Sequence, residues 1–540
     1  MPGNIETNTG VGVDVENRQA PERTPLGWLR FAIPSVADLV FVLLLLALTL
    51  GAMAKGLLGD AGIGWHIRTG EWILQNHAVP RVDLFSSTMA GKEWFAWEWL
   101  YDVIAGALHH VAGLNGVVFG TALVIALTFT LLLRRTLKDG ANLLIAVLML
   151  LLAVAASTIH FLARPHVLSW LFAVIWFGAL DDFEERGNWR RLAWFPVLML
   201  LWVNLHGGFL LGFALLGIYL VSALIVGWTS GSVQDRSYAL NRARVLVGVA
   251  AVSALVTLLN PYGYRLHLHI YRYLTDRFLM DHIDEFLSPN FHGLAQKCFA
   301  LIVLLAVVAL GAARKRVGVS HALLMLFAIY TGLFAARNIP VSSMLLVLVV
   351  APQLSAIVRE LAGSREISEG LRRFMAGFDS FGARMARMDS GLSGHVWPAL
   401  AALAILGLCL HHGDLGNRKV LDAHFSEIRF PVKAADFLAA SGDRDAVFSV
   451  DRWGGYFIYR FYPERKVAID DRHDFYGTEF LKNYLKIVRG EPGWPQALEA
   501  MHAGWVVVPA DSVVTSLLKE NSNWKAVYTD ETAVVFRPTR

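Results

Sequence analysis

The residues best suited to chemistry follow the first long apolar run of the chain, in the segment Gly59–Trp72. Asp60, His66 and Arg68 lie there together with the indole of Trp65. A carboxylate near a low-dielectric region can act as a general base toward a hydroxyl or an amine. We therefore interpret Asp60 as a catalytic candidate assisted by His66. The alternative is a carboxylate that is only solvated at the end of a membrane span.

A divalent cation at this segment is the less favoured interpretation. Hard cations bind several oxygen ligands, whereas Asp60 is the only carboxylate between residues 59 and 65, so an Asp-x-Asp pair is absent. We therefore predict no metal site and no cofactor. The two cysteines, Cys298 and Cys409, both lie in apolar runs, which argues against a disulfide framework or a cysteine-based metal site.

Two arginine motifs lie at other boundaries of apolar runs, Arg164-Pro165-His166 and Arg337-Asn338. An arginine at the edge of the hydrocarbon needs a partner, and guanidinium groups bind phosphate bidentately. The two arginines could clamp a lipid phosphate. Alternatively, they snorkel to the interface or pair with Asp60 or Glu98.

Polar residues also interrupt a long apolar stretch at Asn204-Leu205-His206, followed by two glycines. Such residues are tolerated at membrane depth where they line a cavity, which we favour over a plain loop. Because imidazole titrates near neutral pH, His206 is a further candidate for proton transfer. Tyr262 belongs to a loop, 261–296, that could cover the site and bind an acceptor, or form an amphipathic helix of purely structural importance.

The first polar loop continues through Val79–Ser86 and Lys92–Trp99. Arg81 and Asp83 are close enough in sequence to form a structural pair. Trp94 and its neighbouring tryptophans favour an interfacial helix, although aromatic rings at that depth could also stack on a sugar or an isoprenoid. The predicted catalytic residues are thus Asp60, His66 and His206, and the predicted substrate-binding residues are Trp65, Arg68, Glu71, Arg81, Asp83, Trp94, Glu98, Arg164, His166, Asn204, Tyr262, Arg337 and Asn338.

The composition identifies the class of protein that must position these residues. The 540 residues are 55% hydrophobic and only 17% charged, against about a quarter charged in soluble domains. About eleven apolar stretches approach the ~20 residues that cross a bilayer, and residues 97–112 could add a re-entrant or interfacial helix. The predicted spans are 36–57, 114–133, 142–157, 166–180, 193–205, 207–227, 244–260, 298–313, 320–336, 339–357 and 396–411. This is a polytopic α-helical membrane protein with 11–13 spans, and nothing in it indicates nucleic-acid binding.

The distribution of lysine and arginine predicts the orientation. Five alternate loops are rich in these residues, among them Arg314-Lys315-Arg316 and the long loop 358–394, and such loops stay in the cytoplasm. The N-terminus is then cytoplasmic and the C-terminus extracytoplasmic. The candidate residues and all histidines except His321 and His395 fall on the outer side.

Three regions follow from these patterns. Residues 1–34 form a polar cytoplasmic tail without a clear signal-peptide cleavage site, and residues 35–412 form the membrane domain with a large first outer loop, 59–113. From residue 425 short β-rich runs at 447–450, 466–469, 505–508 and 533–536 alternate with helical patterns at 432–440, 478–488 and 511–520. We expect a small extracytoplasmic α/β domain over 425–540, in which turns and caps explain the glycines of Trp453-Gly454-Gly455-Tyr456.

Nearly the whole chain resembles the GT-C superfamily of membrane glycosyltransferases, in particular a group of uncharacterised bacterial GT-C-like proteins. The motifs that carry the resemblance are Asp60, Trp65-His66, Thr69-Gly70-Glu71, Pro80-Arg81, Asp83, Phe85-Ser86, Trp99-Leu100, Arg164-Pro165-His166, Asn204, His206-Gly207, Asn260-Pro261, Gly263, Ser288-Pro289-Asn290, Trp453-Gly454-Gly455-Tyr456, Asp471-Arg472 and Tyr476-Gly477.

The resemblance implies transfer of a sugar from a polyprenyl-phosphate donor to an extracytoplasmic lipid, polysaccharide or protein at the bacterial cytoplasmic membrane. Asp60 would be the general base or would position the acceptor. Superfamily members that use a metal often carry paired acids in this loop, and here Gly62 occupies the position of the second acid. The alternatives are a non-catalytic GT-C-like component and a transporter for envelope polysaccharide assembly. No protein partner is predicted.

Overall fold

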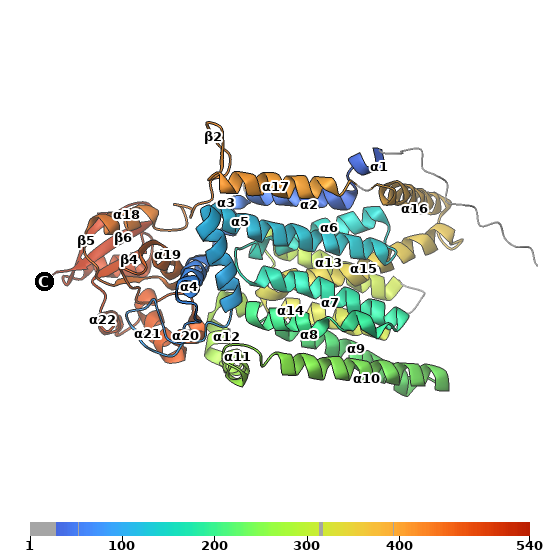
Figure 1. Ribbon diagram of the computed structural model, residues 1–540, viewed down its shortest axis with the longest axis horizontal. Helices are drawn as coiled ribbons and strands as arrows, with labels where there is room; N and C mark the ends of the chain where they lie inside the picture. The colour runs from blue at the N-terminus through green and yellow to red at the C-terminus, as the bar shows by residue number, and fades with distance from the viewer. Residues whose placement is uncertain (1–28, 52, 313–316, 393, 540) are drawn as a thin grey trace, which may run out of the picture.

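The computed structural model describes residues 29–51, 53–312, 317–392 and 394–539. The predicted polar tail 1–34 therefore lies outside the described residues except for its last six positions, and so does Arg314-Lys315-Arg316. The described chain consists of a bundle of long helices with a smaller mixed region at one end (Figure 1). Among the described residues, eight helices are long and apolar enough to cross a membrane, and α14 and α17 are apolar but shorter.

Each predicted span overlaps one helix of this bundle, so the predicted positions are confirmed, while the number of helices that cross the bilayer stays a prediction. The helices are α2 (Val36–Thr49), α5 (Trp99–Lys138), α6 (Leu143–Ser157), α7 (His166–Arg186), α8 (Phe195–Leu205), α9 (Phe209–Thr229), α10 (Val233–Val256), α13 (Leu294–Ala312), α14 (Val319–Phe334), α15 (Ile339–Gly363) and α17 (Val396–Leu410).

One boundary differs from the prediction. The first span ends at Thr49, and a separate short helix, α3 (Ala54–Leu57), follows it. The stretch 97–112, expected as a possible re-entrant or interfacial helix, is the first part of α5, and a kink separates it from the predicted span 114–133. Ala112 and Gly113 are non-helical within α5, and the φ of 58° at Gly113 is one that glycine adopts without steric cost.

The two ends of the bundle carry different elements. The end next to the C-terminal region holds α4 (Gly62–Asn76), α11 (Tyr264–Thr275) and α12 (Arg277–His282), whereas α1 (Leu29–Ala32) and α16 (Glu369–Ser390) lie at the opposite end (Figure 1). Helix α16 belongs to the arginine-rich loop 358–394. The basic loop and the predicted site residues therefore lie at opposite ends of the bundle.

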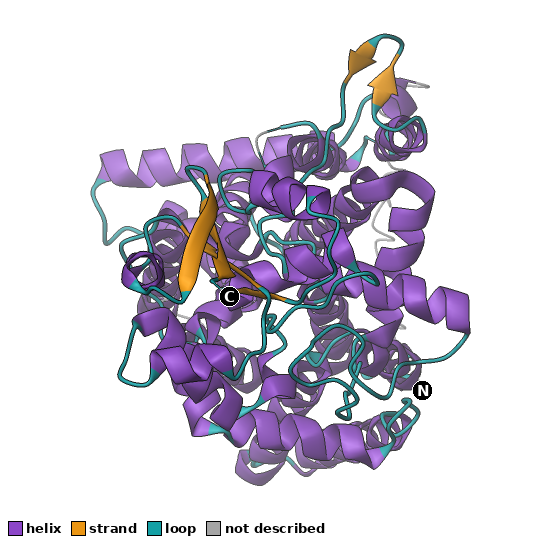
Figure 2. Cartoon of the chain, turned by 90° about the vertical axis from the view of Figure 1, so that its left-hand side faces the viewer, coloured by secondary structure: helices purple, strands orange, loops and turns teal. Residues whose placement is uncertain are grey.

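The C-terminal region contains a four-stranded sheet in the order β3-β4-β6-β5, with β3 and β4 parallel and the other neighbours antiparallel. Viewed from this end, the strands lie in front of the helices of the bundle (Figure 2). The elements are α18 (Val432–Ala440), β3 (Val447–Ser449), α19 (Asp451–Phe461), α20 (His473–Tyr476), α21 (Thr478–Arg489), α22 (Trp494–Glu499), β4 (Trp505–Pro509), α23 (Val513–Glu520), β5 (Trp524–Thr529) and β6 (Ala533–Pro538).

Three of the four predicted strands are present as β3, β4 and β6. The run 466–469 forms only isolated bridges, in which Val467 pairs with Ser86 of the first polar loop and with Val447. Strand β5 was not predicted, because its residues are mostly exposed and lack an apolar run. A hairpin of β1 (Asp414–Leu415) and β2 (Arg418–Lys419) follows α17.

Glycines fix how α4 packs against the C-terminal region. A Cβ on Gly64 would collide with the carbonyl of Gly455, and a Cβ on Gly455 would lie 2.7 Å from the carbonyl carbon of Ala61. Gly454 and Gly455 lie inside helix α19 rather than in a turn, so the turn interpretation of this motif is wrong. Their missing side chains allow the backbones of α4 and α19 to touch.

Candidate active site at the outer end of the bundle

Three charged side chains from distant parts of the sequence meet beside the start of α4, and we call them the outer triad: Asp60, Arg164 and Asp471. Arg164 Nη2 donates to Asp60 Oδ1 at 2.6 Å and also contacts Asp471 Oδ2. Asp60 Oδ1 accepts a second bond from the backbone N–H of Gly62 at 2.7 Å. The side chains remain partly exposed, at 26% for Asp60, 21% for Arg164 and 13% for Asp471. Of the alternatives for Arg164, the structure shows pairing with Asp60.

Gly62 has a specific steric role in this arrangement. A Cβ at this position would collide with the Arg164 guanidinium and lie 2.6 Å from Asp471 Oδ2. Trp65 Nε1 donates to Asp471 Oδ1 at 3.0 Å and so holds the second carboxylate in place. Asp471 Oδ2, from the C-terminal region, thus lies where a side chain at position 62 would be.

Glu98 lies between the two histidines expected to move protons. Its Oε2 is 3.9 Å from His66 Nε2, and its Oε1 is 3.7 Å from His206 Nε2. His66 is fully buried, and its Nδ1 lies 2.5 Å from Asp102 Oδ1. His206 Nδ1 is 2.7 Å from Ser169 Oγ. Each imidazole is therefore held by a partner at its Nδ1, and the Nε2 atoms of both face the Glu98 carboxyl group.

Burial controls the protonation of these groups. Burial raises the pKa of the Glu98 carboxyl to about 8, although the Arg164 guanidinium acts in the opposite direction. Burial, reinforced by Arg337, lowers the pKa of His206 to about 3, and burial and Arg164 hold the pKa of His66 well below its usual value. At neutral pH both imidazoles are uncharged and Glu98 carries a proton in most molecules.

The second arginine motif lies near this cluster but has its own partners. Arg337 Nε is 3.9 Å from Glu285 Oε2, and its guanidinium lies 4.6 Å from the centre of the Phe286 ring. Asn338 donates to the carbonyl of Thr331 at 3.1 Å. His166 Nε2 lies 2.8 Å from the carbonyl oxygen of His160. Asn338 and His166 thus make local structural contacts.

Asn204 lines a groove next to the site. The groove has a volume of about 350 Å³. It is lined by Trp99, Leu100, Leu200, Leu201, Asn204, Leu259, Asn260 and Pro261. Asn204 Oδ1 accepts from Trp99 Nε1 at 2.7 Å, which fixes the indole that directly follows Glu98 in the sequence. An apolar groove thus begins beside the polar cluster.

Arg68 and Glu71 form a separate network on α4. Arg68 Nη1 donates to Glu71 Oε2 at 2.7 Å, and its Nε donates to the carbonyl of Tyr459 at 2.9 Å. Glu71 Oε1 lies 2.7 Å from His109 Nδ1. This network connects α4 to α5 and α19, and within the described residues none of its contacts reaches the outer triad.

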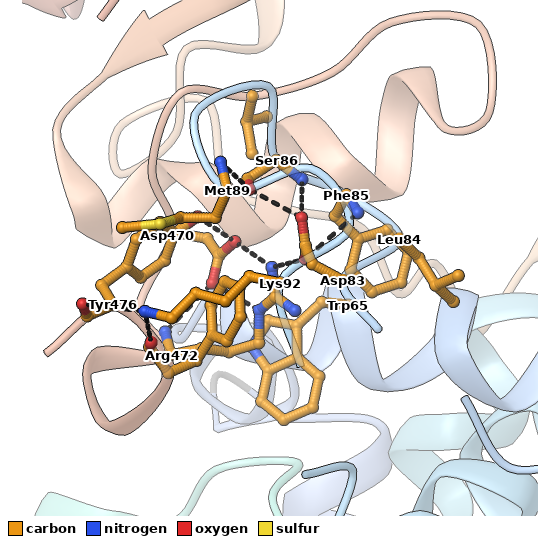
Figure 3. Close-up of polar contacts among 12 residues, drawn as sticks. Trp65, Asp83, Leu84, Phe85, Ser86, Met89, Lys92, Asp470, Arg472 and Tyr476 are labelled. Carbon is orange, nitrogen blue, oxygen red and sulfur yellow. Dashed lines mark hydrogen bonds and ion pairs between the residues drawn. The ribbon is translucent and has the colours of Figure 1, made fainter. Parts of the chain in front are cut away.

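A second set of two aspartates and one arginine, the buried triad, corrects the expected Arg81–Asp83 pair (Figure 3). Asp83 Oδ1 accepts from Arg472 Nη2 at 2.8 Å, and Arg472 also binds Asp470 at 2.7 Å. Arg81 is exposed, and its guanidinium lies 4.7 Å from the centre of the Tyr262 ring.

Trp94 and Tyr262 also differ from their expected roles. Trp94 is 3% exposed, and the Arg472 guanidinium lies over it, 4.6 Å from the centre of the Trp94 ring. Trp94 therefore neither anchors in the membrane nor offers a face to a sugar. Tyr262 accepts from the N–H of Ala96 at 2.8 Å and donates to the carbonyl of Pro80 at 3.1 Å. Tyr262 therefore holds the first polar loop in place, and its loop contains two helices, α11 and α12.

Two residues of the cluster, Asp471 and Asp102, were not among the predicted site residues, although Asp471 belongs to one of the motifs that carry the resemblance. Asp471 is one of several charged residues in Asp470–Asp474, and Asp102 lies inside the apolar pattern of α5. An acidic residue inside an apolar helix is rare and by itself indicates a functional site. This signal could have identified Asp102. Among the described residues, no group of three or more His, Cys, Asp or Glu side chains is placed to hold a metal ion.

No protein-family model and no curated protein sequence matches the chain. Its structure is similar to that of the oligosaccharyltransferase of Archaeoglobus fulgidus in the apo form, with a TM-score of 0.51 and 10% identity over 88% of this chain and 69% of that one. It is also similar to ArnT from Cupriavidus metallidurans bound to undecaprenyl phosphate, with a TM-score of 0.47 and 14% identity over 95% and 98% of the two chains.

The arabinofuranosyltransferase AftD from Mycobacteria has a TM-score of 0.47 and 13% identity, over 95% of this chain and 41% of that one. Sequence identities this low are evidence for a shared fold only. The likeness to the oligosaccharyltransferase extends over 88% of this chain. The chain is therefore a multi-pass membrane protein with the fold of the GT-C glycosyltransferases.

Proposed function

We propose that this protein is a glycosyltransferase that moves a sugar from a polyprenyl-phosphate donor to an extracytoplasmic acceptor. The observation that carries the proposal is the outer triad, in which a partly exposed carboxylate and an arginine lie together at the end of the bundle. The apolar groove of about 350 Å³, lined by Trp99 and Asn204 among others, suits an isoprenoid chain. The fold is shared with an oligosaccharyltransferase.

Asp60 is the proposed base. Its Oδ1 is engaged by Arg164 and Gly62, whereas its Oδ2 has no hydrogen-bond partner within the described residues. In the proposed step, an acceptor hydroxyl or amine attacks the anomeric carbon of the sugar and gives its proton to Asp60 Oδ2. The bond between the anomeric carbon and the phosphate oxygen breaks, and polyprenyl phosphate leaves with that electron pair.

Arg164 is the proposed phosphate-binding residue. Only Nη2 of its guanidinium has a hydrogen-bond partner in the described part of the chain, and Nε is buried without one. A donor phosphate could therefore bind Arg164 without displacing Asp60. Charge developing on the leaving phosphate is stabilised by a positioned guanidinium, and such preorganised groups contribute strongly to catalysis. Arg337 is proposed as the second cation that faces this phosphate.

His66, Glu98 and His206 are proposed to position substrate hydroxyls. Because the imidazoles are neutral and Glu98 is protonated at neutral pH, the three side chains together offer hydrogen-bond donors and acceptors without net charge. Such a polar, uncharged wall suits a sugar. We further propose that this end of the bundle is extracytoplasmic and that the protein lies in a bacterial cytoplasmic membrane, as the arginine-rich loops indicate.

The direct test is the release of polyprenyl phosphate. The full chain, purified in detergent, is incubated with undecaprenyl-phosphate donors carrying labelled hexoses or pentoses and with a membrane extract as acceptor. Lipid products are followed by mass spectrometry. We expect release of undecaprenyl phosphate from one donor class, and loss of that release in Asp60→Asn by about 10²–10⁴-fold, the usual contribution of a general base.

Asp511→Asn is the control, because Asp511 is exposed and its side chain has no hydrogen bond or ion pair in the described residues. It should release the lipid at the wild-type rate. Asp60→Asn with wild-type activity would contradict the proposed base. A protein that binds the donor but never releases polyprenyl phosphate with any acceptor extract would instead be the non-catalytic component considered from the sequence.

A further inference from the structure

A second polar site lies at the opposite end of the bundle from the outer triad. It is a cavity of about 450 Å³, formed where α5 and α7 end and where the short helix η2 (Trp189–Leu192) leads into α8. We call it the basic cavity. Its lining residues are Arg135, Gly178, Ala179, Asp182, Arg190, Arg191 and Trp194. Three arginines thus face a single aspartate.

The ion pairs around Asp182 show which cation of this cavity is free to bind a ligand. Asp182 accepts from Arg135 Nη1 at 2.7 Å, from Lys138 Nζ at 2.7 Å, and from Arg191. Arg135 also pairs with Asp139 and Asp181, so these inner charges balance. The Arg190 side chain has neither a hydrogen bond nor an ion pair with any described residue, and it is exposed. Arg190 therefore adds an unpaired positive charge at the rim, and the Arg191 side chain beside it is 40% exposed.

The position of the cavity relative to the membrane follows from the aromatic residues around it. Trp189 is 57% exposed and Trp194 is 68% exposed, and both lie between the apolar span of α7 and the apolar helix α8. Exposed tryptophans at such positions lie at the level of the lipid headgroups. The rim of the basic cavity is therefore at the membrane surface.

We propose that the basic cavity binds the anionic headgroup of a phospholipid. Guanidinium groups bind phosphate oxygens with paired hydrogen bonds, and Arg190 and Arg191 are placed to do so at the rim. The Trp194 indole, which lines the cavity, packs against the glycerol and the upper acyl chain. A free phosphate ester would share the phosphate contacts but would have no use for the two exposed indoles, so the lipid is favoured.

The position of this site links it to the outer end of the protein. Helix α7 begins at His166, two residues after Arg164, and α8 ends at Leu205, next to His206. The basic cavity lies where the other ends of these two helices are joined. A bound lipid would therefore stabilise the connection between two helices that carry outer-site residues. The lipid site itself does not depend on the proposed transferase activity.

The test is native mass spectrometry of the purified full chain with added phosphatidylglycerol or phosphatidylcholine. The double variant Arg190→Gln/Arg191→Gln should bind phosphatidylglycerol about thirtyfold more weakly, as expected from the loss of two charges near a lipid surface. Arg190→Gln alone should bind it about fivefold more weakly, and this variant removes no contact of the folded protein. Phosphatidylcholine should bind weakly to every form.

The matched control is Arg186→Gln/Arg236→Gln, which removes two exposed arginines at the same end of the bundle but outside the cavity. It should retain phosphatidylglycerol within about twofold of wild type. Equal losses in the two double variants would overturn the proposal, because they would indicate general attraction to a basic surface. Glycerol phosphate that binds as tightly as the lipid would overturn the lipid assignment in favour of a soluble phosphate ester.

Discussion

Two arginines of this protein, Arg164 and Arg472, each lie between two aspartates, but their surroundings differ. In the buried triad, Arg472 is 1% exposed and both of its partners, Asp83 and Asp470, are fully buried. In the outer triad, Arg164 is 21% exposed and Asp60 26%. One arginine and two aspartates thus form one enclosed cluster and one that solvent or a substrate can reach.

The hydrogen bonds sharpen this difference. Asp83 Oδ2 accepts from the backbone and hydroxyl of Ser86 at 2.8 and 2.6 Å. Asp470 Oδ2 accepts from Tyr476 at 2.9 Å. In the outer triad, Asp60 Oδ2 has no hydrogen-bond partner among the described residues. Saturated carboxylates hold a fold together, whereas an unused acceptor in a partly exposed cluster is available to a ligand.

Arg472→Gln should have the largest effect on stability. Removal of one partner from a buried ion pair costs about 3–5 kcal/mol, because the remaining charges stay buried without compensation. The first polar loop and the C-terminal region would lose their shared cation. Thermal unfolding in detergent, followed by tryptophan fluorescence, measures the loss.

The control for this variant is Arg452→Gln, which removes an exposed arginine of the neighbouring helix α19. Its melting temperature should stay at the wild-type value. Asp83→Asn is a milder second variant for the case in which Arg472→Gln does not accumulate, and it should also lower the melting temperature. Equal stability of Arg472→Gln and Arg452→Gln would remove the distinction between the two triads.

Arg164→Gln should have a large effect on activity and a smaller effect on stability than Arg472→Gln. If its guanidinium stabilises the leaving phosphate, transfer should fall by about 10²–10³-fold, as for other preorganised charge-stabilising groups. Arg164→Lys should recover only part of the activity, since an ammonium cannot reproduce the planar geometry of the guanidinium. The measurements are the rate of polyprenyl-phosphate release and the melting temperature of each variant. A stability loss as large as that of Arg472→Gln would make Arg164 a structural residue.

Gly62→Ala should disturb the outer triad alone. The added methyl group would collide with Arg164 and approach Asp471 Oδ2 to 2.6 Å, so the triad must open, and we expect transfer to fall by about tenfold. Gly56→Ala is the matched control on the preceding helix, because a Cβ there meets no atom within 4 Å. Both variants are assayed for transfer and for melting temperature. Wild-type activity in Gly62→Ala would show that the triad geometry is not needed.

The sequence predicted the helical elements well, because long apolar runs leave few alternatives in a membrane. It also identified Asp60, Arg164 and His206, since polar residues at the ends of apolar runs stand out. It named Asp471 only as part of a motif and could not place it beside Asp60, because Asp471 is 406 residues away from its partner Trp65. Pairings over such distances depend on tertiary packing, here on the contact between the glycines of α4 and α19.

The same limit explains the error at Asp83. Arg81 lies two positions away in the sequence, and a local pair was the simplest interpretation. The structure instead brings Arg472 to Asp83 and leaves Arg81 exposed. The aromatic residues of the loop were read as membrane anchors for a related reason. Composition shows that Trp94 is amphipathic, but only the fold shows that its face is covered by an arginine.

Glu98→Gln should have little effect at acidic pH and tests whether burial keeps the outer site uncharged. The folded-state pKa of Glu98, raised to about 8 by burial, lies above its ordinary value of 4.5. The folded protein therefore keeps a proton that the unfolded chain has released at intermediate pH. This contribution to stability is fully present below about pH 4.5 and is lost as the pH rises through about 8. Glutamine stays neutral, so the melting temperature of Glu98→Gln should gain on that of the wild type as the pH rises from about 5 to 8. Asp83→Asn, in the buried triad, should lie below the wild type at both pH values. If the melting temperatures of Glu98→Gln and the wild type change with pH in parallel, Glu98 is ionised in the folded protein. The outer site would then be the more charged of the two regions.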